Sequence, residues 1–237
     1  MDKQHREDLK KDQFVETVGH SVEYVASHKS QVYSYVALGL AAAAIALGVY
    51  WFTGSRKAQQ QADLAQALQI RSATIGAKTD PNDPRPAFAT EADKSTALAK
   101  ALTEVAAKHS GSDAASVAHY QLGVVASDKG DMAEAAKHFE KAVAEGSRDY
   151  SSVAKLSLAQ VYHAQSKSGE AEKLLKELMA SPSTLVSKEQ ATFTLARLLM
   201  SSNPAEARKL IDPLTKDSSP VVVRNAVGMM GELPTGK

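Results

Sequence analysis

The sequence predicts an all-α protein, in which an N-terminal transmembrane helix is followed by an α-solenoid of helix hairpins. Three observations lead to this fold class. Residues 30–55 contain no Asp, Glu, Lys or Arg. Beyond residue 112, small and apolar residues recur with a period of about 36 residues. The 237-residue chain is rich in Ala, which favours closely packed helices, whereas only 5% of its residues are aromatic.

Residues 1–29 form an N-terminal tail of mixed charge, within which we expect an amphipathic helix. Phe14, Val18, Val22 and Val25 are spaced three or four positions apart, as on one face of a helix. Such a helix would lie on the membrane surface ahead of the span. The alternative is a short exposed helix whose apolar face binds a partner.

Residues 30–55 are predicted to be a single transmembrane helix in a lipid bilayer. At 1.5 Å per residue, the apolar segment 32–52 spans about 30 Å, the thickness of the hydrocarbon layer. Tyr33 and Trp51 stand near its two ends, where amphipathic rings fit the headgroup regions. A cleaved signal peptide and a buried helix of a soluble protein are the alternatives.

Charge gives little information on the orientation of this span. Lys29 precedes it, whereas Arg56 and Lys57 follow it, which slightly opposes a cytoplasmic N-terminus. Small residues four positions apart allow close approach of two helices, so homo-oligomerisation through the span stays open. These pairs are Gly39 with Ala43, and Ala44 with Gly48.

Residues 56–237 are predicted to form the helical repeat domain. A helix is expected over 56–77, where it continues the span, and three prolines in 80–86 then exclude regular structure. Thr90 and Asp93 have the spacing of a capping box and predict a helix over 91–108.

Three similar units follow, each predicted to be a helix hairpin that stacks on the next. Small residues occupy the sites where the two helices of a unit cross, and a larger apolar residue fills the space between units. The small residues are Gly123, Ala159 and Ala196 on the first helices, and Ala135, Ala171 and Ala207 on the second; the larger ones are Phe139, Leu175 and Ile211.

Residues typical of helix starts mark the boundaries of these helices. Asp131 with Glu134 forms a capping box, and Asn203 with Pro204 combines an N-cap with a first-turn proline. Ser168 and Gly169 mark the turn of the second unit. Ser219 and Pro220 predict a last helix that runs to about residue 230.

The repeats resemble the tetratricopeptide repeat, although His119 and Ala126 replace its usual Trp and Tyr in the first unit. With the tail and the span, the chain also looks like the membrane-anchored ancillary subunit of the bacterial Sec translocon. That resemblance implies a single-pass protein of the bacterial inner membrane, with a cytoplasmic N-terminus and a periplasmic C-terminal domain. It implies translocon subunits, chaperones or secretory chains as partners. A structural scaffold for cell division or outer-membrane assembly is the alternative.

Stacked hairpins present a concave face lined by the first helix of each unit, which suits a peptide segment. The repeat register predicts three rows of partner-binding residues on this face. They are Tyr120, Leu156 and Phe193; Val124, Gln160 and Arg197; and Asp128 with His163. Alternatively, Tyr120, Leu156 and Phe193 pack beneath the terminal helix around 221–227.

The sequence gives no indication of catalysis. It contains no Cys, and no nucleotide-binding or hydrolase motif stands out, so we expect neither catalytic nor cofactor-binding residues. The seven His residues lack metal-site spacings, and although His119 and His138 could approach within one hairpin, packing is the commoner role of such residues. With 28 basic and 27 acidic residues, no nucleic-acid partner is expected.

Overall fold

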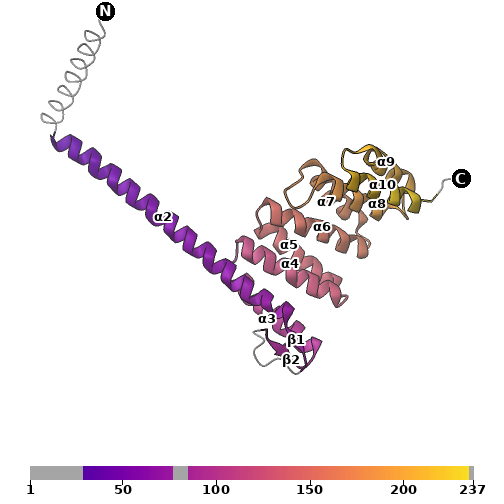
Figure 1. Ribbon diagram of the computed structural model, residues 1–237, viewed down its shortest axis with the longest axis horizontal. Helices are drawn as coiled ribbons and strands as arrows, with labels where there is room; N and C mark the ends of the chain where they lie inside the picture. Colours follow the sequence, from indigo (N-terminus) through magenta and orange to yellow (C-terminus); the bar gives the residue numbers. More distant parts are fainter. Residues whose placement is uncertain (1–28, 77–84, 235–237) are drawn as a thin grey trace, which may run out of the picture. The chain divides into compact units, whose positions relative to one another are not determined.

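A computed structural model describes residues 29–76 and 85–234 of the chain. The amphipathic helix expected in the tail and most of the proline-rich segment 80–86 lie outside the described residues. The chain divides into two compact units, residues 1–58 and 59–237, which we describe separately. Most described residues are helical, as the sequence predicts (Figure 1).

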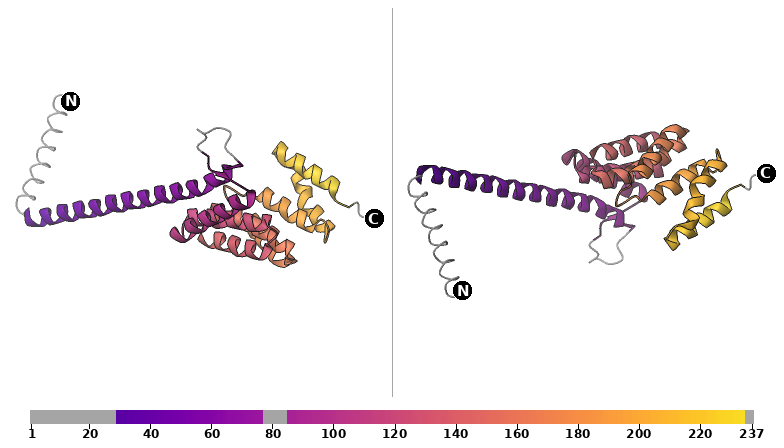
Figure 2. Two further views of the ribbon diagram at one scale, coloured as in Figure 1. Left: turned by 90° about the horizontal axis from the view of Figure 1, so that it is seen from below. Right: turned by 90° about the horizontal axis from the view of Figure 1, so that it is seen from above.

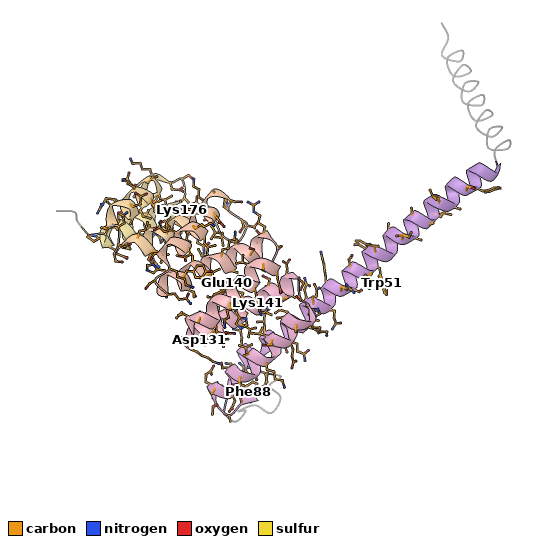
Figure 3. All side chains as sticks on the ribbon, turned by 180° about the vertical axis from the view of Figure 1, so that it is seen from behind. Trp51, Phe88, Asp131, Glu140, Lys141 and Lys176 are labelled. Atoms are coloured by element: carbon orange, nitrogen blue, oxygen red, sulfur yellow. The ribbon has the colours of Figure 1, made fainter. Side chains whose placement is uncertain are left out.

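The described part of the first unit is the N-terminal portion of a long helix, α2 (Lys29–Gln69). By length and composition, the segment Ala37–Ser72 is apolar enough to cross a membrane. Its large side chains are exposed, with 68% of Leu47 and 76% of Trp51 accessible. Figure 3 shows Trp51 projecting from the helix. The apolar segment that was predicted to span a membrane therefore lies within one uninterrupted helix, α2.

The second unit begins with the end of α2, which is shorter than predicted. Instead of reaching residue 77, the helix ends at Gln69 and is followed by a 3-10 turn, Ile70–Ser72. Two short strands, β1 (Thr74–Ile75) and β2 (Ala87–Phe88), then pair in parallel. Thr74 N–H donates to the carbonyl of Pro86, and Gly76 N–H donates to that of Phe88. These backbone bonds replace helical ones, so the all-α prediction missed a small strand pair.

The end of α2 packs against α3 (Glu91–Lys108), which has the bounds that the sequence predicts. Ala67 lies in a buried apolar cluster with Leu98 and Leu102. Asp63 supplements this contact, because its Oδ2 accepts hydrogen bonds from Lys108 Nζ and His109 Nε2, both at 2.7 Å. These two bonds hold the pKa of Asp63 at about 2, well below its ordinary value.

Three helix starts predicted from the sequence, with N-caps at Asp131, Asn203 and Ser219, are confirmed. Asp131 and Asn203 each accept a backbone N–H three residues ahead, as N-caps do. Pro213 lies two residues beyond the end of α9 at Ile211, where the chain continues into a 3-10 turn, Asp212–Lys216. The helices are α4 (Asp113–Asp128), α5 (Met132–Glu145), α6 (Arg148–Ala164), α7 (Ser168–Ala180), α8 (Lys188–Leu199), α9 (Pro204–Ile211) and α10 (Pro220–Glu232).

The turn between α6 and α7 lies slightly N-terminal to its predicted position. Ser168 and Gly169 belong to the first turn of α7, and Ser166 adopts the left-handed backbone conformation with φ of 61°. Lys167 N–H donates to the carbonyl of Tyr162, which closes this turn. The hairpin is thus formed by residues that precede the Ser-Gly pair.

The repeat pattern is confirmed by how closely the paired helices approach. Ala135, Ala159 and Ala171 are fully buried. At Gly123 a Cβ would stand 2.7 Å from the Phe139 ring, a distance that requires a neighbouring atom to move. Phe139 is 2% exposed and shares a cluster with Leu158 of the next unit, as expected for a residue between units.

Successive helices of this unit pack against one another from α3 to α9, and α10 packs on α9 and on the 3-10 turn before it. Helix α4 also contacts α6, and α6 contacts α8. Figure 2 shows these helices following one another in two further views. The first helices of the three units therefore share one side of the stack, which we call the α4–α6–α8 face.

Candidate functional site

The α4–α6–α8 face is where the sequence places a binding site, and its helices expose a mixed surface there. In α4, Tyr120 and Val124 are half-buried, one turn apart. In α6, Gln160 is exposed between buried Ala159 and Val161. In α8, half-buried Phe193 precedes exposed Arg197 by one turn. Each helix buries its small residues against its partner and leaves these larger side chains on the open side.

The first groove lies between α4 and α6 and has a volume of about 360 Å³. Tyr120, Val124 and Gln160, which belong to the predicted partner-binding residues, line it together. The ring of Tyr120 lies 5.6 Å from that of Phe139, between centroids, so the groove rests directly on the hydrophobic core. Its other lining residues are Ser127, Met132, Phe139, Ser157, Val161 and Ala164.

The second groove lies between α8, α6 and the terminal helix, and has a volume of about 470 Å³. Phe193, Arg197 and Gln160 line it together, so Gln160 belongs to both grooves. Val222 and Asn225 of α10 form part of its wall. Helix α10 thus borders the groove at Phe193, while Tyr120 lines a groove that α10 does not line.

Three predicted residues lie apart from these grooves. Asp128 is exposed at the end of α4 and lines a separate hollow beside Arg71 and Lys94. Leu156 packs against the C-terminal apolar cluster, and His163 is half-buried near the end of α6; neither lines the two grooves. The structure therefore brings together five of the eight predicted residues, Tyr120, Val124, Gln160, Phe193 and Arg197.

Several lining residues were not predicted from the sequence. On α6, Ser157 and Ala164 share the groove side with Gln160, because residues three and four positions apart lie on one helix face. The sequence shows this spacing, but the alignment of the repeats led us to predict Leu156 and His163 as the binding residues of α6. Val222 and Asn225 reach the second groove through the tertiary position of α10, for which the local sequence holds no signal.

The lining chemistry suits the binding of a polypeptide. Ser157, Gln160 and Thr194 offer uncharged hydrogen-bonding groups, while Tyr120 and Phe193 offer partly exposed rings. Gln side chains both donate and accept, as peptide groups require. Among the described residues, no group of three or more His, Asp or Glu is placed to hold a metal ion.

Outside the face, the structure confirms that His119 and His138 approach within one hairpin. Their Nδ1 atoms lie 3.2 Å apart, and the ring centroids are 5.4 Å apart. Burial lowers the pKa of both imidazoles, although nearby Glu145 and Glu134 oppose this effect.

Comparisons with known proteins agree with this architecture. A family described as "Tetratricopeptide repeat-like domain" matches residues 26–190. Two crystal structures from Podosopora anserina, described as "putative kinesin light chain nearly identical TPR-like repeats", one of them with a single substitution, are similar in fold. Each is 16% identical, with a TM-score of 0.50, and the match covers 73% of this chain and 89% of the other. No curated protein matches the sequence.

Proposed function

The chain belongs to the tetratricopeptide repeat-like domain family, and on this premise we propose that it binds a polypeptide segment across the α4–α6–α8 face. One observation carries the proposal. Two adjoining grooves, which share Gln160, offer the rings of Tyr120 and Phe193 beside uncharged polar groups. Repeat solenoids generally use such faces for extended or helical peptides. No side-chain constellation for catalysis stands out among the described residues, and the fold is typically a non-catalytic scaffold.

We further propose that α2 anchors the protein in a lipid bilayer. The uncharged segment 30–55 and the exposed apolar side chains of α2 support this proposal, since a helix satisfies its own backbone hydrogen bonds in lipid. The N-terminus would be cytoplasmic, and the repeat domain would lie in the periplasm of a bacterial cell. This orientation follows the resemblance to the ancillary subunit of the Sec translocon.

The proposed partners are translocon subunits, chaperones or secretory chains. Photoreactive residues placed at Tyr120 and Phe193, in the full chain in intact membranes, should crosslink to one of these classes. Lys176 on α7 is the matched control position, because its side chain is exposed and it lines neither groove (Figure 3). Equal crosslinking from all three positions, or recovery of none of these partners, contradicts the proposal.

Membrane anchoring is tested separately by fractionation and protease access. The full chain should sediment with membranes until detergent is added. Leu47→Arg should release part of it, because a central Arg costs about 2.5–3.5 kcal/mol of insertion free energy. Protease added to spheroplasts should digest the repeat domain. A chain that stays in solution without detergent, or a fully protected domain, overturns this part.

A scaffold for cell division or outer-membrane assembly is the second candidate. The observation that favours it is the spacing of small residues in α2, where Gly39 lies four positions before Ala43 and Ala44 four positions before Gly48. Such a surface lets two helices approach closely. Size measurements in detergent over a range of protein concentrations distinguish the candidates, since a monomer at every concentration excludes self-assembly through the span.

A further inference from the structure

His119 of α4 and His138 of α5 form a pair in which each of the four ring nitrogens lies near a nitrogen or carboxylate oxygen of another side chain. The two Nδ1 atoms face each other at 3.2 Å. At the opposite ends of the rings, His119 Nε2 lies 4.0 Å from Glu145 Oε1, and His138 Nε2 lies 3.5 Å from Glu134 Oε1. Each imidazole thus has a carboxylate at one nitrogen and the other imidazole at the second.

The positions of the two protons of the neutral pair decide whether its Nδ1 atoms can accept a cation. A neutral imidazole carries one N–H. If both N–H groups point at the carboxylates, the two Nδ1 lone pairs face each other without a proton between them. If one proton lies between the Nδ1 atoms, it completes the 3.2 Å contact as an N–H···N hydrogen bond. In the first of these states, both Nδ1 lone pairs are free to bind a positive ion.

We propose that His119 and His138 bind a divalent transition-metal ion, of the zinc class, through their Nδ1 atoms. Two nitrogen ligands of a tetrahedral zinc ion, at bond lengths of about 2.0–2.1 Å, lie about 3.3 Å apart, close to the 3.2 Å observed. Histidines that bind metals usually donate their other N–H to a carboxylate, which is the role open to Glu145 and Glu134. Imidazole ligands favour zinc, copper and nickel over magnesium or calcium.

The surroundings hold two carboxylates that favour a cation at this position and one basic side chain that opposes it. Glu145 Oε2 is buried and has no hydrogen-bond partner among the described residues. Lys137 is paired with Glu134 Oε2 at 2.9 Å, which leaves Oε1 of that carboxylate for His138. Lys141, one turn beyond His138, adds an opposing positive charge (Figure 3).

Two protein ligands leave coordination positions for water, so the site would exchange metal readily. The side chain of His119 is 11% exposed, whereas that of His138 is 19% exposed, so an ion would enter beside His138. The sequence spacing did not indicate this site because its ligands come from different helices. Only the packing of α4 on α5 brings them together.

The test uses the full chain in detergent, without a histidine tag and after treatment with a chelator. Calorimetric titration with ZnCl₂ should show one zinc ion per chain, and CoCl₂ should give the visible absorption of nitrogen-ligated cobalt. His119→Gln and His138→Gln should each weaken zinc binding at least about 10-fold, and Glu145→Gln should weaken it by about 10–100-fold or less. His163→Gln, outside the pair, should leave binding unchanged.

The controls separate loss of a ligand from loss of the fold. Circular dichroism shows whether each variant is folded. If the His119→Gln variant is unfolded because His119 is buried, the variants at the half-buried residues, His138→Gln and Glu145→Gln, still test the site. Equal zinc binding by the wild type and by the folded His138→Gln variant overturns the proposal. The proposal is also overturned if the wild-type protein releases no heat of binding with zinc and shows no visible absorption with cobalt, while its ¹⁵N spectrum shows a proton shared between the two rings.

Discussion

The backbone of Gly123 lies so close to the Phe139 ring that a Cβ at Gly123 would stand 2.7 Å from Cε1. Gly123→Ala is therefore expected to lower the free energy of unfolding by about 1–3 kcal/mol, since overpacking forces the ring or a helix to move. Chemical denaturation measures this change. Gly228→Ala is the matched control, because no atom lies within 4 Å of its added Cβ and Ala favours the helix. A Gly123→Ala protein as stable as the control contradicts this packing.

Phe139 fills the space between the first and second units, so Phe139→Ala should cost about 3–5 kcal/mol of unfolding free energy. Phe139→Leu should cost less. Combined with Gly123→Ala, Phe139→Leu should cost less than the sum of the two single changes, because a smaller side chain gives the added methyl room. Thermal denaturation of the single and double variants measures this coupling. Strict additivity would show that the two sites do not touch.

The pKa of Asp63, held at about 2 by Lys108 and His109, predicts a defined pH dependence. The unfolded pKa is about 3.9, so the folded state binds fewer protons between these values. The stabilisation is complete above pH 4 and is lost as the pH falls through about 2. Unfolding of the wild type and of Asp63→Asn, followed between pH 2 and 7, should show a smaller loss of stability at low pH for the variant. Parallel curves would contradict the bonds at Asp63.

Asp131 caps α5 by accepting the backbone N–H of Glu134 at 3.0 Å. Asp131→Ala leaves that N–H without its acceptor and should cost about 0.5–2 kcal/mol. Asp131→Asn keeps an oxygen acceptor and should cost much less. Denaturation midpoints at pH 7 compare the two variants. Equal losses would mean that the charge, rather than the cap bond, stabilises the helix.

Much of the repeat domain was predictable because its signals are local or periodic. Residue type alone predicts the helix starts at Thr90, Asp131 and Asn203. Each of these side chains accepts the expected backbone N–H. Buried Ala135 and Ala171 follow the period of the repeat. In contrast, β1 and β2 are two residues long, too short for any periodicity, and their pairing spans residues distant in the sequence.

The candidate site was predictable only in part, for two physical reasons. The repeat register fixes which helix lines the face, but the rotation of α6 decides that Ser157 rather than Leu156 faces the groove. The position of α10 beside Phe193 depends on how the chain turns after Pro213. The histidine pair likewise depends on helix packing, because His119 and His138 lie 19 positions apart.

The position of Gln160 on the border of both grooves has a thermodynamic consequence. A short ligand that takes the amide of Gln160 in one groove removes a hydrogen-bonding group from the other, so two short ligands should bind with negative cooperativity. A ligand long enough to cross the border occupies both grooves through one shared amide and avoids this competition. If the face binds polypeptides as proposed, this coupling would select for the length of the bound segment.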